Sequence, residues 1–267
     1  MRASGIITIT TDFGHKGPFA AIMKGVILGR FPAAKIIDLA HDIPAQWPPE
    51  AGFWVSRSYQ WFPAGTVHLA IVDPGVGTER EILVVECDSH IFMAPDNGLL
   101  AQLIDSDSDP QVHKLALENL DSLNLPSPSA TFHGRDIFAP VAAELASGRI
   151  AVADIAEKTN DWTPGWIDEP EVASGKVAGV IVTVDTFGNL ISNIDASLLG
   201  AFKEPVAEIA GHQVPLRITY GRATPGDYLA LVNSFGVVEI ARAEGSAADG
   251  LGSARGAPLI IRDGYVT

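Results

Sequence analysis

The chain is short of cysteine, of long apolar runs and of positive charge, and each shortage excludes a class of protein. Cys87 is the single cysteine among 267 residues, which excludes an intrachain disulfide and a cysteine metal cluster. No apolar run approaches the roughly 20 residues that cross a bilayer, and the N-terminus lacks the pattern of a secretory signal. We therefore expect a cytoplasmic protein that does not bind membranes.

Acidic residues outnumber basic ones by 32 to 18, which gives a formal net charge of −14. Such a surface repels phosphate backbones, so nucleic acid is not an expected partner. The same charge can attract a cationic small molecule, although solubility alone would also account for it.

Strand-like and helix-like segments alternate through the first half of the sequence. Ile6–Thr11 is rich in β-branched residues and Val67–Val72 is apolar, so both are predicted strands. Pro18–Arg30 and Arg135–Ser147 carry the helical pattern. Further predicted strands are Lys35–Leu39, Ile82–Cys87 and Ile91–Ala94. A helix is predicted over Glu50–Trp61, and another begins with Gly98–Ile104. This alternation predicts an α/β domain over residues 1–160 with a mostly parallel sheet.

The second half has a different character. Residues 161–175 contain two prolines and two glycines and are predicted to be a linker. Residues 176–267 carry short β-like runs between turn residues, which predict a small β-barrel domain. These runs are Lys176–Val184, Leu190–Ile194, Val214–Tyr220, Tyr228–Val232, Val237–Ala241 and Leu259–Arg262.

Polar clusters follow the predicted strands of the first domain, where ligands bind in open α/β sheets. They are Thr11–Gly14 (TDFG), Asp73–Arg80 (DPGVGTER), Asp96–Leu99 (DNGL) and, before a helix, Thr131–Asp136 (TFHGRD). Each has a plain alternative: an aspartate in such a place is often a cap or turn residue. Asp73 and Arg80 would form a structural salt bridge, and a lone histidine such as His133 is often structural.

Two kinds of site are not signalled. DPGVGTER lacks the Lys-Ser/Thr ending of a P-loop and the spacing of a dinucleotide fingerprint. His15, His41 and His133 are far apart and no HExxH motif is present, so no metal site is predicted. In the second half, Asp185–Asn189 (DTFGN) and Asn233–Gly236 (NSFG) are each typical of an ordinary hairpin turn.

Taken in order, the motifs resemble one family from about Ile6 to about Ile261: TDFG, HDIP (His41–Pro44), DPGVGTER, DNGLL, TFHGRD, DTFGNLISNI and NSFGVVEIA. The chain is similar to the S-adenosyl-L-methionine (SAM) hydroxide adenosyltransferases, or adenosine-forming SAM hydrolases, which are related to the fluorinase and chlorinase enzymes. The resemblance implies an N-terminal α/β domain, a C-terminal β-barrel and a homotrimer with active sites at subunit interfaces.

The resemblance also implies a set of site residues. Asp73, Arg80 and His133 match the catalytic set of the hydrolases, which the halogenases replace. We expect these three to activate a water that attacks the 5′ carbon of SAM, giving adenosine and L-methionine without metal or cofactor. Substrate-binding positions implied or expected are Asp12 for the ribose, Tyr220 stacking on adenine, Asp185, Asn189 and Ser234 at the methionine end, and Val76, Asn97, Phe132 and Phe187 elsewhere in the pocket.

Alternatives remain open at this point: a halogenase, a SAM or adenosine sensor without turnover, and a metal-dependent hydrolase. Two departures from the family pattern bear on substrate packing. Gln46 stands where the family usually has an aromatic residue, with Trp47 one step along. Gly17 and Phe19 stand where the halogenases carry a polar pair.

Overall fold

The computed structural model describes the backbone of residues 2–264 and the side chains of these residues except Asp121, Ser122 and Arg222. The chain divides into two compact units, Met1–Trp166 and Ile167–Thr267. The division falls within residues 161–175, and that stretch also supplies a short strand to the second unit. None of the helices in the described chain combines the length and apolar character that a membrane crossing requires.

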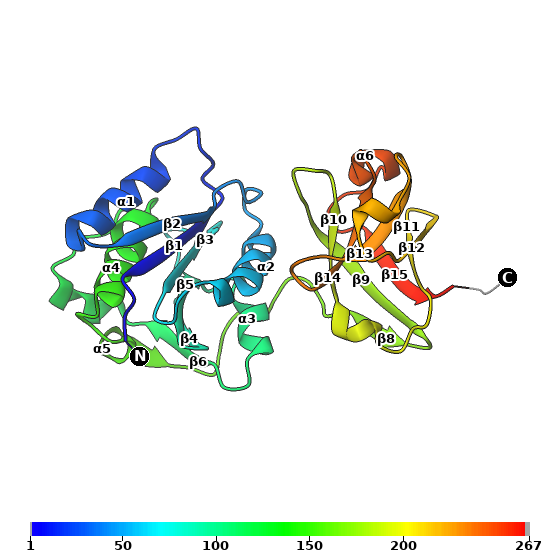
Figure 1. The fold of residues 1–267 in the computed structure, drawn as a ribbon. Coiled ribbons are helices and arrows are strands. Elements are labelled where there is room, and N and C mark those ends of the chain that lie inside the picture. The colour runs from blue at the N-terminus through cyan, green and yellow to red at the C-terminus, as the bar shows by residue number, and fades with distance from the viewer. Residues whose placement is uncertain (1, 265–267) are drawn as a thin grey trace. The chain divides into compact units, whose positions relative to one another are not determined.

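The first unit is built on a seven-stranded sheet with the order β2-β1-β3-β5-β4-β6-β7 (Figure 1). Its strands are β1 (Ile6–Thr11), β2 (Lys35–Ala40), β3 (Val67–Ile71), β4 (Ile82–Cys87), β5 (His90–Pro95), β6 (Gln111–Leu115) and β7 (Ala156–Lys158). β2, β1, β3 and β5 pair in parallel, whereas β4, β6 and β7 pair antiparallel. The predicted α/β class is confirmed, and the antiparallel half begins at a two-residue turn, Asp88-Ser89, with both residues left-handed.

Helices cover both faces of this sheet (Figure 1). α1 (Phe19–Arg30) and α4 (Ala139–Ser147) share one core with Val67, Leu69 and Ile71 of β3. α2 (Pro48–Ser58) and α3 (Ala101–Ser106) share the other core with Ala70 and Val72. Successive residues of a strand face opposite sides, so the apolar residues of β3, with Val72 directly after it, supply both cores. Shorter helical segments are Tyr59–Trp61, Leu117–Leu123 and α5 (Val152–Ile155).

The predicted helix Arg135–Ser147 is helical throughout, but its first turn is a π-helix, Gly134–Phe138, which leads into α4. The Ala139 N–H bonds to the Gly134 carbonyl, five residues back, instead of four. Pro140 follows and has no N–H to donate, so an ordinary helical bond is missing at this point.

The second unit is an antiparallel sheet of eight strands that curls into a nearly closed barrel. The path is β12-β11-β15-β9-β10-β14-β13, with β8 beside β9. Its strands are β8 (Glu171–Ala173), β9 (Lys176–Val184), β10 (Leu190–Asp195), β11 (Pro205–Ile209), β12 (His212–Pro215), β13 (Tyr228–Val232), β14 (Val237–Arg242) and β15 (Pro258–Asp263). An isolated bridge between Leu216, directly after β12, and Ala230 of β13 links the two edges of the sheet. Helical segments are Ala196–Leu199, Tyr220–Arg222 and α6 (Ala247–Leu251).

The predicted strand Val214–Tyr220 is wrong over most of its length. β12 ends at Pro215, and Tyr220 opens a helical turn. Pro215 pairs with Val206 of β11, and pairing ends at the next residue, where the Leu216 N–H donates at 3.2 Å to the carbonyl of Pro205, the first residue of β11. The chain instead crosses to the other edge of the barrel, where the Arg217 N–H donates to the Ala230 carbonyl at 2.7 Å.

The parallel strands fix where the polar motifs gather. Thr11 of β1 is paired with Ile71 of β3, and β3 is paired with β5. The carboxyl ends of these three strands therefore lie at one edge of the sheet. Asp12, Asp73 and Asn97 follow these strands and emerge at that edge.

Candidate active site

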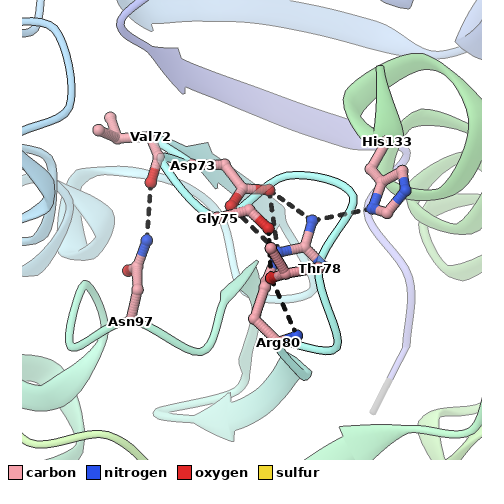
Figure 2. Close-up of polar contacts among 7 residues, drawn as sticks. All are labelled: Val72, Asp73, Gly75, Thr78, Arg80, Asn97 and His133. Carbon is pink, nitrogen blue, oxygen red and sulfur yellow. Dashed lines mark hydrogen bonds and ion pairs between the residues drawn. The ribbon is translucent and has the colours of Figure 1, made fainter. Parts of the chain in front are cut away.

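The loop after β3 is held in shape by its own hydrogen bonds (Figure 2). The Thr78 hydroxyl donates to the Gly75 carbonyl at 2.7 Å and accepts from the Arg80 N–H at 3.3 Å. The Val76 N–H donates to the Asp73 carbonyl at 3.3 Å. The chain thus turns back on itself and brings Arg80 beside Asp73.

Gly77 lets this loop touch the segment that precedes His133. Its φ is +80°, and a Cβ built at this position would lie 2.1 Å from the carbonyl oxygen of Ala130. Both the left-handed backbone and the close approach require glycine. The second glycine of DPGVGTER therefore has a structural reason that connects two motifs distant in sequence.

Asp73 and Arg80 form a buried ion pair. The Arg80 Nε donates at 3.0 Å to both carboxylate oxygens of Asp73, and Nη2 also donates to Oδ2. Their side chains are 7% and 11% exposed, respectively. The guanidinium also lies 5.9 Å from the centre of the Phe138 ring. A forked, buried pair of this kind holds the arginine in one orientation.

His133 completes the group (Figure 2). Arg80 Nη2 lies 3.0 Å from His133 Nδ1. A guanidinium has only donors, so Nδ1 accepts this bond, and the neutral ring carries its proton on Nε2. Burial and then the charge of Arg80 lower the pKa of His133 below its usual value, although Asp73 and Asp136 oppose the shift. The structure thus brings together all three predicted catalytic residues and presents His133 as a neutral ring.

Asp136 and Arg135 shape the segment that carries His133. Asp136 accepts from the Ser129 N–H at 2.8 Å and from Arg135 Nε at 2.6 Å. The bond from Arg135 and the Ser129 N–H lower the pKa of Asp136 to about 2, against burial. The last two residues of TFHGRD therefore close the loop from residue 129 to residue 136.

Asp12 lies between the loops that follow β1 and β2. Its Oδ2 accepts from the Gln46 backbone N–H at 2.9 Å, and Gln46 has a φ of +60°. The Thr11 hydroxyl lies 2.8 Å from Nδ1 of the buried His41, whose Nε2 is 3.0 Å from Asp38 Oδ1. TDFG and HDIP are thus bonded to each other. Asp12 uses the backbone of residue 46, not the side chain that departs from the family pattern.

Phe19 and Trp47, which also depart from the family pattern, pack against other aromatic side chains. Phe19 packs on Phe13 and Phe132, with ring centres 5.9 Å and 5.5 Å away. Trp47 packs edge-on against Trp166 at 5.6 Å. Predicted pocket residue Phe132 is therefore one wall of an aromatic cluster beside His133.

Asn97 is committed to the main chain. Its Nδ2 donates to the Val72 carbonyl at 2.8 Å, and its Oδ1 accepts from the Leu99 N–H at 3.3 Å. It ties the end of β5 to the end of β3 and so supports the loop that carries Asp73. Its expected contact with substrate stays a prediction.

In the second unit, Asp185 organises the DTFGN turn. Its Oδ1 accepts from the N–H groups of Phe187 and Asn189, both at 2.9 Å, and its Oδ2 accepts from Asn189 Nδ2 at 2.9 Å. Asn189 is buried, whereas Phe187 is 77% exposed. The turn is therefore rigid at its base and presents an aromatic side chain to its surroundings.

A second polar group in this unit was missed by the sequence prediction. Glu239 of β14 is only 3% exposed. Its Oε1 accepts from the Tyr220 hydroxyl at 2.6 Å, and its Oε2 accepts from Asn233 Nδ2 at 3.1 Å. Burial and the charge of Asp185 raise the pKa of Glu239, against these two bonds. A charged residue inside the apolar run VVEIA was the available signal, because a buried charge requires partners.

Two hollows and one cluster of metal-ligand atoms occur elsewhere in the described chain. One hollow of about 380 Å³ is lined by His212, Tyr228 and neighbours, and one of about 340 Å³ by Gly65, Arg149 and neighbours. Neither is lined by a predicted site residue. Cys87, Asp88 and Asp107 have side-chain ligand atoms within 4.8 Å of one another. They lie at the amino end of β5, opposite the edge that carries Asp73.

The comparisons agree with the motif order. The protein-family model for the SAM hydroxide adenosyltransferase N-terminal domain matches residues 7–156, and the family model for the C-terminal domain matches residues 179–260. The chain is 37% identical to the protein named (R)-S-adenosyl-L-methionine hydrolase of Salinispora tropica, over 97% of this chain and 98% of that one. It is 36% identical to the protein of the same name from Thermus thermophilus, over 93% and 96%.

A more distant relative is named fluorinase, from an Actinoplanes species, at 26% identity over 91% of this chain and 93% of that one. Among solved structures, an uncharacterized conserved protein from Thermotoga maritima matches with a TM-score of 0.87 and 31% identity, over 96% of this chain and 99% of that one. The family models span both units of the structure. The chain therefore belongs to the SAM hydroxide adenosyltransferase family.

Proposed function

We propose that this protein hydrolyses SAM at the 5′ carbon, so that water and SAM give adenosine, L-methionine and one proton. The observation that carries the proposal is the convergence of Asp73, Arg80 and His133 at the carboxyl edge of the sheet. Family membership and the names of the relatives supply the substrate class. Those names specify the (R) form, and we extend that preference to this chain.

The reaction suits a poorly hydrated pocket. SAM is a sulfonium cation, and methionine leaves with a neutral sulfur. A nucleophile with hydroxide character neutralises opposite charges as the new bond to the 5′ carbon forms. Such an attack is favoured where water does not screen the charges. The cluster of Phe13, Phe19 and Phe132 supplies an apolar wall beside His133.

Arg80 is the group that would stabilise hydroxide. Its Nε–H and both N–H groups of Nη2 are engaged by Asp73 and His133. The two N–H groups of Nη1 bond to none of the described residues and are free to donate to a water or hydroxide. Because the guanidinium is permanently charged, it favours the anionic form of that ligand at neutral pH.

The roles of the other two residues follow from the protons. His133 accepts from Arg80 through Nδ1, so its Nε2–H is a donor and orients the water without taking its proton. In this proposal His133 is therefore not the base. Asp73 is then the acceptor in the group, since each carboxylate oxygen has more than one lone pair. The aspartate also keeps Arg80 aimed at the reacting atoms.

Two replacements of one residue separate these roles. His133→Asn puts an amide oxygen near the place of Nδ1, so it keeps the acceptor for Arg80 and deletes the Nε2–H. His133→Gln does the reverse. If the donor matters most, Asn should lower kcat by about 100-fold or more with little change in KM, and Gln should lower it less. Wild-type kcat in both variants would contradict a catalytic role for His133.

The direct assay uses purified protein and each sulfonium epimer of SAM, without added metal or halide. We expect adenosine and methionine in equal amounts, faster from the (R) epimer. A halogenated nucleoside on addition of chloride or fluoride would favour the halogenase. Loss of turnover with a chelator would favour a metal-dependent hydrolase, for which the cluster at Cys87 is the first place to look. Binding without turnover would favour a sensor.

The remaining positions are proposed as the substrate pocket. We assign Asp12 to the ribose, Tyr220 to the adenine, and Asp185, Asn189 and Ser234 to the methionine end. Phe187 and Ile218 are 77% and 89% exposed, which is unusual for large apolar side chains. We assign both side chains to contacts with a second copy of the chain in a homotrimer. Light scattering after gel filtration tests the trimer, and a monomer would refute it.

A further inference from the structure

Two segments of the second unit meet at one buried carboxyl group. Tyr220 belongs to the helical turn Tyr220–Arg222, and Asn233 belongs to the turn between β13 and β14. Glu239 lies under both and gives one oxygen to each, at 2.6 Å and 3.1 Å. No cation bonds to Glu239 among the residues that the structure describes. Within the described part of the chain, these two donors alone hold the carboxyl group.

The donors point one way. The pKa of Tyr220 is raised by burial and by the bond to Glu239, so its hydroxyl keeps its proton and donates. The Asn233 Oδ1 accepts from the N–H groups of Phe235 at 3.0 Å and Val237 at 3.3 Å. The amide cannot rotate without losing those bonds, so its Nδ2 must face Glu239. The carboxyl group therefore fixes the orientation of a ring and of a turn.

The ring and the turn belong to opposite ends of the substrate under the proposed function. Tyr220 is assigned to adenine, and the turn of Asn233 carries Ser234, assigned to the methionine end. We propose that Glu239 is a positioning residue that couples the adenine end of the pocket to the methionine end. The inference rests on the proposed function for the two assignments, and on the contacts of Glu239 for the coupling.

A reciprocal exchange tests the direct contact. Asn233→Asp places a second carboxylate against Glu239, and like charges in a buried site repel. Adding Glu239→Gln restores the pattern: the introduced amide donates to the introduced carboxylate at position 233, and its oxygen accepts from Tyr220. We expect N233D to weaken binding of both adenosine and methionine by about tenfold or more, and the double variant to recover most of that loss.

Two milder variants keep the test informative if N233D does not fold. Tyr220→Phe removes the hydroxyl and keeps the ring, and Glu239→Gln alone keeps the volume. Each should raise the Kd for adenosine by about three- to tenfold, equivalent to part of one hydrogen bond. The double variant should raise the Kd for adenosine by less than the product of the two single increases, because both replacements remove the same contact. With SAM as substrate, KM should rise while kcat changes little.

The matched control is Glu208→Gln, the same chemical change on β11 of the same barrel. Glu208 pairs with Arg262 and Gln213 and contacts neither Tyr220 nor Asn233. It should leave the affinities for adenosine and for methionine unchanged.

Calorimetry with these two fragments of the substrate, adenosine and methionine, measures the affinities without any turnover. If wild type binds the fragments but does not hydrolyse SAM, the proposed function fails and the coupling is still decided. Unchanged adenosine affinity in folded E239Q and Y220F, or no recovery in the double variant, would overturn the coupling.

Discussion

Acidification should destabilise the first unit through a buried histidine at the start of β3. His68 Nδ1 lies 2.8 Å from the Thr8 hydroxyl, and its Nε2 lies 3.1 Å from Nδ1 of His90. The His68 ring also stacks on Phe92 at 4.8 Å. Burial, and then the neighbouring His90, lower the pKa of His68 to about 3. The folded state therefore keeps this ring neutral at pH values where the unfolded chain protonates it.

The sign and size of the effect follow from that difference. Between pH 6.5 and pH 3 the unfolded chain binds one more proton than the folded chain at His68, so stability falls as the pH falls. One pKa unit corresponds to about 1.36 kcal/mol. From pH 7 to pH 5 most of the change comes below the unfolded pKa of about 6.5, which predicts a loss of about 2 kcal/mol from His68.

The assay is urea unfolding followed by tryptophan fluorescence at pH 8, 7, 6 and 5. All five tryptophans lie in the first unit, so the signal reports that unit. Wild type and His68→Gln are compared by their slopes with pH, and the value at pH 8 separates lost packing from lost titration. The variant should lose the larger part of the slope. Equal slopes in the two proteins would refute the reasoning.

Three further predictions concern the site. Gly77→Ala forces a left-handed alanine against the Ala130 carbonyl and should lower kcat at least tenfold. The control is Gly211→Ala: Gly211 has a similar φ of +77° but lies in open space, so its replacement should lower stability alone. Equal losses of kcat in the two variants would contradict this prediction. Asp136→Asn should lower the free energy of unfolding at pH 7 by about 1–3 kcal/mol, as measured by the fluorescence assay. Wild type should lose the same stability below pH 4, as the pH approaches the Asp136 pKa of about 2 and the carboxyl group protonates. Protonation of His133 Nδ1 would set its new N–H against the Arg80 Nη2–H, which is also a donor. The profile of kcat/KM against pH should therefore fall on the acid side, below the usual histidine pKa. A flat profile down to pH 4 would contradict this prediction.

Much of the fold could be predicted because the pattern and the packing agree. β1 is rich in β-branched residues and β3 is apolar apart from His68, and the structure buries both between two layers of helices. The strands β11 and β12 could not be predicted correctly, because the turn between them depends on a backbone conformation that its residue type does not favour. Ala210 adopts a φ of +49° in the two-residue turn Ala210-Gly211 between β11 and β12, where asparagine before the glycine would have signalled a hairpin. β11 was therefore missed, and β12 was placed two residues late and carried on to Tyr220.

The candidate site divides in the same way. Asp73, Arg80 and His133 could be named from motif order, but their contacts depend on tertiary approach. Nothing local in the sequence places residue 77 against Ala130, or gives His133 the arginine as its partner. Glu239 could not be assigned a role because its two partners lie 19 and 6 positions away along the chain. Such contacts are decided by barrel register and not by local propensity.

The wide turn at Gly134–Phe138 has a consequence for how this enzyme tolerates change. A π-helical turn accommodates one residue more than an α-helical turn, and such turns are often found at functional sites. Removing one residue here would give an ordinary helix but would rotate everything upstream by about 100° relative to α4. The imidazole would then swing away from the guanidinium while the helix itself became more regular. Selection for helix stability and selection for the position of that ring therefore act in opposite directions at this one turn.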